Sequence, residues 1–199
     1  MKVERDVSAL PRHGFGTHSL TWWGTLGFMA LEGSGFVLAA GAYLYLMTLA
    51  QKWPLNAPQP DVWPGTVVAI MLLASLPLNM LMSRWAKQED LVKVRWGLVG
   101  MSLFGIAPLI VRCFEFSAVN VRWDDNGYGS VVWFLLGLHT THIFADVAET
   151  LVLTALMFTR HGQNGRRFGD VHDNAFYWYF VVLTWLPIYA LLYWVPRAA

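Results

Sequence analysis

The residues best suited to chemistry lie together in one apolar segment in the second half of the chain. They are His139, His142, Asp146 and Glu149, at offsets of 0, 3, 7 and 10. At 100° per residue, a helix places all four within an arc of about 80°, so they share one face. Such side chains bind metals, relay protons or form hydrogen-bonded packing surfaces. The order differs from the Glu-x-x-His of di-iron bundles, which favours a polar face packed on helices or on a partner subunit.

The segment that carries this face is one of five apolar segments. Each is long enough to span a ~30 Å hydrocarbon layer, which takes about 20 helical residues. In chain order they are Trp22–Leu49, Val62–Ser83, Trp96–Val119, Ser130–Phe158 and Phe176–Trp194. The connectors are short and polar, so none forms a second domain. The sequence predicts an all-α integral membrane protein, with a cytoplasmic tail over residues 1–20 and a single five-helix bundle over residues 21–199.

The composition agrees with a membrane protein. Hydrophobic residues make up 56% of the chain and charged residues 14%, whereas a soluble domain averages about 25% charged residues. The net charge of +1 gives no reason to expect nucleic acid as a partner. Cys113 is the single cysteine, which excludes an intramolecular disulfide, and its apolar surroundings predict a small buried side chain.

The placement of Lys and Arg predicts the orientation of the bundle. Ten of these residues fall in the N-terminal tail and in the second and fourth connectors, and three fall on the opposite side. Because cytoplasmic segments carry the excess of positive charge, we expect the N-terminus in the cytoplasm and the C-terminus outside. Arg160, Arg166 and Arg167 form a basic cluster in the fourth connector. This cluster is a candidate for binding an anionic lipid head group, although the topology signal alone explains it.

Two further sets of polar residues fall inside apolar segments. Glu32 lies deep in the first segment and has three possible roles: a neutral carboxyl bonded to a neighbouring helix, a carboxylate paired with a cation, or a proton-relay group. Arg112 and Glu115 are three residues apart near the end of the third segment. This spacing places them on one face and predicts an ion pair that anchors the outer end of the bundle.

Several motifs along the chain occur together in one family. They are WWGTLGFMALEGSGF around Glu32, Glu115-Phe116, Tyr128-Gly129-Ser130, the paired histidines of LGLHTTHI, and AFYWYFVVLTWLPIYALLYW at the end. They resemble a helix with a buried glutamate, and the E-Y, Y-G-S, T-G-x-H-x-x-H-V and Y-W-H-F-V motifs, of subunit III of the haem–copper terminal oxidases (cytochrome c oxidase subunit III). The chain resembles a short, five-helix form of this family. Asp146, Glu149, Tyr179 and Val182 depart from the family's pattern.

The resemblance implies an accessory subunit with no catalytic centre, metal or other cofactor in this chain. Such a subunit packs on the catalytic subunit I, which holds haem and copper with other oxidase subunits, in the bacterial inner membrane. It also holds phospholipid and supports proton uptake. The candidates for proton-uptake or partner contacts are Glu32, Glu115, His139, His142, Asp146 and Glu149.

Three other functions stay open from the residues. One is a subunit III-like component of a nitric oxide reductase complex. A second is a free-standing membrane metalloenzyme that uses the polar face at residues 139–149. The third is a small transporter with Glu32 and Asp146 as coupling carboxylates, although five segments do not divide into two equal inverted repeats.

Overall fold

The structure is a computed structural model that describes residues 14–55 and 57–198. All the long elements in this part of the chain are helices. The long helices are α1 (Leu20–Leu49), α2 (Val62–Lys87), α3 (Leu91–Ala118), α4 (Gly127–Phe158) and α5 (Gly165–Tyr189). All five are long and apolar enough to cross a membrane, α5 together with its extension to Ala198. The predicted fold class is therefore confirmed. Residues 1–13, most of the predicted tail, lie outside the described residues, and the division into tail and domain stays a prediction.

Shorter elements complete the chain. A 3₁₀ turn at Gly16–His18 precedes α1, and a second at Arg160–Gln163 joins α4 to α5. After α5 the helix continues as a π-helical turn over Ala190–Trp194 and then as α6 (Val195–Ala198). This C-terminal end is tied to the α1–α2 connector, because Arg197 Nη2 donates to the Pro60 carbonyl at 2.6 Å.

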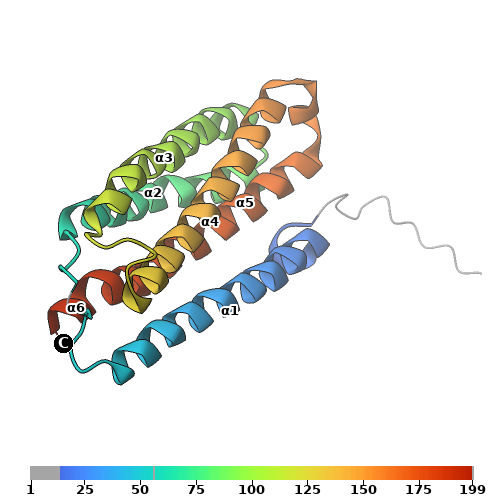
Figure 1. Cartoon of the computed structure of the whole chain (residues 1–199). Coiled ribbons are helices and arrows are strands. Elements are labelled where there is room, and N and C mark those ends of the chain that lie inside the picture. Colours follow the sequence, from blue (N-terminus) through green and yellow to red (C-terminus); the bar gives the residue numbers. More distant parts are fainter. Residues whose placement is uncertain (1–13, 56, 199) are drawn as a thin grey trace, which may run out of the picture.

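The helices form a bundle in which α1 lies at one edge, along α4 and α5, while α2 and α3 lie on the other side (Figure 1). The start of α1 and the C-terminus lie at opposite ends of the bundle, as an odd number of spans requires. In the most apolar stretch of α1 only 11% of residues are buried, against 39–50% in the other four helices. Most of the surface of α1 is therefore left for lipid or for another protein.

Close packing among α2, α3 and α4 depends on small residues. A Cβ atom added at Gly97 would overlap Met82 of α2, and one added at Gly105 would overlap Val147 of α4. The polar helix starts are capped by side chains. Asp90, Asn126 and Asn164 accept hydrogen bonds from the backbone N–H groups of Lys93, Gly129 and Arg166. These caps fix where α3, α4 and α5 begin.

Two sequence predictions need correction. The last long helix begins at Gly165 and not at Phe176, because the capped polar stretch before Phe176 is helical although it lacks hydropathy. His172 and Asp173 therefore lie inside α5, and Arg166 and Arg167 in its first turn. Cys113 is exposed on α3 and not buried.

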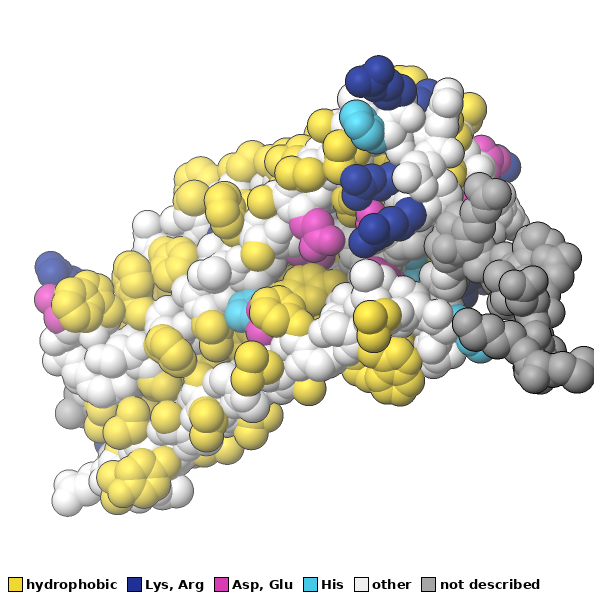
Figure 2. All heavy atoms as spheres, turned by 90° about the vertical axis from the view of Figure 1, so that its right-hand side faces the viewer, with side chains coloured by type: hydrophobic (Ala, Val, Ile, Leu, Met, Phe, Trp, Pro, Cys, Tyr) yellow, Lys and Arg dark blue, Asp and Glu magenta, His cyan; other side chains and the backbone are white. Residues whose placement is uncertain are grey.

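The surface reflects a chain that meets hydrocarbon over most of its length. Large hydrophobic side chains are exposed on every long helix. On the face drawn in Figure 2, most of the visible Lys and Arg side chains gather at one end, and acidic side chains lie in a hollow between hydrophobic ones. The acidic hollow interrupts an otherwise apolar surface, and its residues are among those predicted as functional.

Candidate functional site

Glu32 of α1 is held by side chains from two other helices. The Tyr177 hydroxyl of α5 donates to Glu32 Oε2 at 2.7 Å. His142 Nε2 of α4 lies 3.2 Å from Glu32 Oε1, close enough for an ion pair but without good hydrogen-bond alignment. Glu32 therefore joins α1 to both helices against which it packs.

One nitrogen of the His142 ring has a defined proton. Its Nδ1 atom lies 2.6 Å from the Leu138 carbonyl, which only accepts, so Nδ1 carries a proton. A favourable contact between Nε2 and Glu32 Oε1 then needs one further proton, on either the imidazole or the carboxyl. With that proton the pair would be neutral overall, but Nε2 makes no aligned hydrogen bond to Glu32.

A second buried cluster surrounds Arg112. Its guanidinium donates from Nη1 to Glu115 Oε2 at 2.7 Å and lies 4.1 Å from the centre of the Trp185 ring. Tyr193 donates to the other Glu115 oxygen at 2.5 Å. Arg112 and Glu115 are 1% and 0% exposed, so the charges are paired away from solvent. This cluster joins α3 to the C-terminal end of the chain.

The four residues of the predicted polar face reach three different surroundings. His139 contacts the Arg112 cluster, and His142 contacts Glu32. Asp146 and Glu149 instead line a pocket of about 250 Å³ between α1, α4 and α5. Within residues 14–55 and 57–198, no three His, Cys, Asp or Glu side chains are grouped so that they could hold a metal ion. The four residues lie on one face of α4, as predicted, but they contact different groups.

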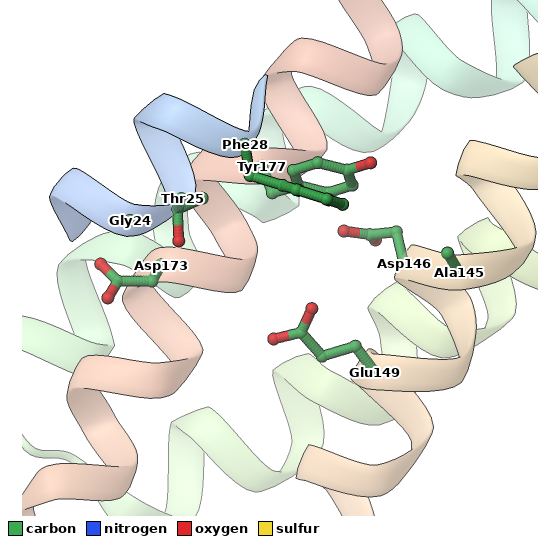
Figure 3. Close-up of a pocket in the computed structure, with 8 residues that line it drawn as sticks. All are labelled: Gly24, Thr25, Phe28, Ala145, Asp146, Glu149, Asp173 and Tyr177. Carbon is green, nitrogen blue, oxygen red and sulfur yellow. The ribbon is translucent and has the colours of Figure 1, made fainter. Parts of the chain in front are cut away.

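The pocket combines acidic and aromatic walls (Figure 3). Asp146 and Glu149 project into it from α4, and the rings of Phe28 and Tyr177 face them from α1 and α5. Asp173 of α5 also lines the pocket and accepts a hydrogen bond from Thr21 at 2.6 Å. The pocket is adjacent to the Glu32 pair, since Tyr177 lines the one and bonds to the other.

The predicted lipid-binding residues lie at the end of the bundle that holds the α4–α5 turn. Arg160 is in the 3₁₀ turn, and Arg166 and Arg167 are in the first turn of α5. Arg167 Nη1 pairs with Asp170 Oδ2 at 2.8 Å, which partly neutralises it. Arg160 and Arg166 are exposed, and their binding of a lipid head group stays a prediction.

The sequence did not indicate two tyrosines on which these clusters depend. Both lie in the aromatic final segment, and each donates its hydroxyl to a glutamate: Tyr177 to the half-buried Glu32 and Tyr193 to the buried Glu115. For Tyr177 the sequence did contain a signal. Asp170, Asp173 and Tyr177 recur at helical spacing and form a polar stripe on α5, which the late predicted start of that helix concealed.

Comparison with known proteins assigns the chain to a family. The sequence pattern of cytochrome c oxidase subunit III matches residues 60–196, which cover α2 to α5. The chain belongs to the cytochrome c oxidase subunit III family. The resemblance in the sequence motifs is thereby confirmed. Five helices able to span a membrane and membership of this family make it a multi-pass membrane protein.

Individual relatives extend the match beyond the family pattern. Cytochrome c oxidase subunit 3 of Drosophila yakuba is 26% identical over 96% of this chain and 76% of its own length. The subunit 3 of Thermostichus vulcanus is 22% identical over 87% of each chain. That of Pylaiella littoralis is 30% identical over 67% of this chain and 53% of its own. The first alignment is long enough to include most of α1, so the family likeness is not confined to the last four helices.

Proposed function

We propose that this chain is a non-catalytic subunit III of a bacterial respiratory haem–copper oxidase. It packs on the catalytic subunit I in the inner membrane, with its N-terminus in the cytoplasm, and supports the stability, lipid binding and proton uptake of the complex. The observation that carries the proposal is the family match over residues 60–196, four of the five membrane-spanning helices. Haem and copper belong to the partner subunits.

The exposed surface of α1 leaves room for a partner subunit as well as for lipid. Helix α1 is buried along one side only. Its outward side carries large exposed residues such as Leu31, Val37 and Leu38, at 70%, 71% and 74% exposure. A bundle that works alone meets lipid on this side, whereas a subunit of a complex has room there for lipid and for a partner.

The geometry around Glu32 supports the part of the proposal that concerns protons. His142 Nε2 lies 3.2 Å from Glu32 Oε1, and the acidic pocket lies next to this pair. A carboxyl–imidazole pair inside a membrane is typical of proton-handling sites. The basic cluster at the α4–α5 turn supports the lipid-binding part, since Lys and Arg at the cytoplasmic surface attract anionic head groups.

A purification from the native host tests the proposal. The affinity-tagged chain is extracted in mild detergent, and the product is examined by haem absorption spectra and mass spectrometry. We expect a haem-containing catalytic subunit at a constant ratio to the tagged chain, and oxygen consumption with a reduced electron donor. Reduction of nitric oxide but not of oxygen by the purified complex would instead assign the chain to a nitric oxide reductase.

The role in proton uptake needs its own variant. Glu32→Gln keeps the shape of the side chain but removes the exchangeable carboxyl proton. We expect the haem content to stay at the wild-type ratio while oxidase activity is lost severalfold faster during sustained turnover. Isolation of a stable chain free of haem, from cells whose oxidase is unchanged when the gene is deleted, would overturn the assignment as a whole.

A further inference from the structure

Two hollows run together on the side of the bundle where α1 meets α4 and α5. The first, about 250 Å³, is the pocket with Asp146 at its inner wall. The second, about 510 Å³, shares Thr25, Glu149 and Asp173 with the first and continues past Val152 of α4. Together they form one groove, which is called the acidic groove below. Its open side faces away from the bundle (Figure 2).

Neither Asp146 nor Glu149 forms an ion pair with a residue that the structure describes, although Arg167 also lines the groove. Asp146 is 2% exposed, and the one hydrogen bond it accepts is long, 3.4 Å from Asn174 Nδ2 to Oδ1. Its Oδ2 atom and the whole Glu149 carboxylate accept no hydrogen bond within residues 14–55 and 57–198. By contrast, Asp170 at the outer end of the groove pairs with Arg167.

This arrangement is incomplete for a pair of acids in a membrane-spanning helix. Intramembrane carboxylates are rare and usually pair with a cation. Asp146 and Glu149 are three residues apart on α4, so their negative charges repel each other when both are ionised. One cation placed between them in the pocket would offset both costs, and Figure 3 shows both side chains projecting toward the same space.

The walls of the groove indicate that the cation arrives on another helix. A Cβ atom added at Gly24 of α1, which lines the groove, would meet nothing within 4 Å, so the backbone is open there. Ala145 and Ala148 of α4 are exposed along the opposite rim. Small residues on two neighbouring helices let the backbone of a third approach closely.

We propose that the acidic groove receives a lysine or arginine side chain from a membrane-spanning helix of another subunit of the oxidase. The cation lies between Asp146 and Glu149, with the aromatic rings of Phe28 and Tyr177 beside it, and ring faces attract cations. This inference rests on the proposed function, because it requires a complex. It assigns α1 and α4 to an intersubunit contact and gives a role to Asp146 and Glu149, which set this chain apart from its family.

Photo-crosslinking from the rim of the groove tests what occupies it. p-Benzoylphenylalanine replaces Ala145 in the tagged full-length chain, expressed in the native host, and membranes are irradiated before purification. We expect a covalent product with the haem-bearing or another oxidase subunit, attached within one helical turn of a Lys or Arg. The same probe at Ile70, 61% exposed on α2 and outside the groove, should not give this product. Adducts with lipid alone at position 145 would overturn the proposal.

Charge removal gives an independent readout. In the double variant Asp146→Asn with Glu149→Gln, we expect haem per tagged chain to fall on the order of tenfold, because loss of one partner strands a desolvated cation. Asp124→Asn, an exposed change in the α3–α4 connector, is the control and should keep the wild-type ratio. A wild-type haem ratio in the double variant would refute the groove as a contact site while leaving the proposed function intact. Absence of haem from the wild-type chain would refute the proposed function itself.

Discussion

Arg112 Nη2 lies 3.0 Å from His139 Nδ1, and this contact determines which nitrogen of the imidazole carries the proton. A guanidinium only donates, so Nδ1 must accept. The proton is then on Nε2, which lies 2.9 Å from the Val181 carbonyl and donates to it. His139 therefore connects the buried cation of α3 to the backbone of α5 as a neutral side chain with one defined tautomer.

Removal of His139 should destabilise the bundle. His139→Ala leaves a guanidinium N–H of Arg112 without its acceptor in a fully buried position, while the Val181 carbonyl keeps the Thr184 hydroxyl as a donor. Unsatisfied buried groups cost about 1–3 kcal/mol, so we expect the free energy of unfolding to fall by about that amount. Thermal unfolding in detergent measures the change. His161→Ala, an exposed change in the α4–α5 turn, should leave the midpoint unaltered, and equal effects of the two variants would contradict this role.

Substitution of Glu115 should lower the free energy of unfolding more than substitution of Tyr193. Glu115→Gln leaves Arg112 as a buried cation without a counter-charge, which costs about 3–5 kcal/mol in such pairs. Tyr193→Phe removes one neutral donor from a carboxylate that keeps Arg112, and we expect about 1–2 kcal/mol. Yield of folded protein and thermal midpoint, compared for the two variants, test the order. A milder effect for Glu115→Gln would mean that the charges are not mutually dependent.

Two glycines provide a matched test of helix packing. Gly105→Ala forces a methyl group into Val147 of α4, and overpacking of this kind costs about 1–3 kcal/mol. Gly137→Ala adds the same atom where nothing lies within 4 Å, so the better helix propensity of alanine should be neutral or stabilising by up to about 1 kcal/mol. Opposite shifts in the thermal midpoint are the expected result. Similar shifts would show that α3 and α4 do not pack as closely as described.

The stability that the Asp90 cap gives to the start of α3 should depend on pH. The Lys93 ammonium and backbone N–H bond to its carboxylate and lower its pKa below the ordinary value. A carboxyl with a depressed pKa in the folded state stabilises above its unfolded pKa of about 3.9 and loses that contribution as pH falls through the folded value. Asp90→Ala should therefore lower the thermal midpoint at pH 7 and by less near pH 3, where the contribution of the carboxylate has begun to be lost.

The control for this prediction is another residue at the start of a helix. Asp61 precedes α2, and its side chain makes no cap hydrogen bond. The Asp61→Ala change should therefore have no comparable dependence on pH. If Asp90→Ala lowered the midpoint equally at both values, the carboxylate bonds to Lys93 would not be its cause.

The number and type of the elements could be predicted from the sequence because twenty-residue apolar runs leave few alternatives in a membrane. The residues at which the helices begin and end were harder to predict. Gly165 begins α5 through the Asn164 cap, and the polar turns that follow have no hydropathy to mark them. The Arg112–Glu115 pair could be anticipated because its spacing is local to one helix.

Contacts between helices could not be predicted in this way. Glu32 and Tyr177 are 145 residues apart, and Arg112 and His139 are 27 apart. Helical periodicity shows which side chains share a face but not which face of another helix they meet. For this reason His139, His142 and Asp146 looked like one site and prove to be parts of three.

The position of α1 has a consequence for how the protein is made. The first helix packs mainly on α4 and α5, the last two long helices of the chain, whereas α2 and α3 form a hairpin of sequence neighbours. Contacts between distant segments form late because the intervening chain must first be ordered. During synthesis α1 thus enters the bilayer before α4 and α5, the helices on which it packs. In that interval Glu32 lies in the membrane without Tyr177 and His142, and this is the stage at which a chaperone or an early assembly partner has the most to protect.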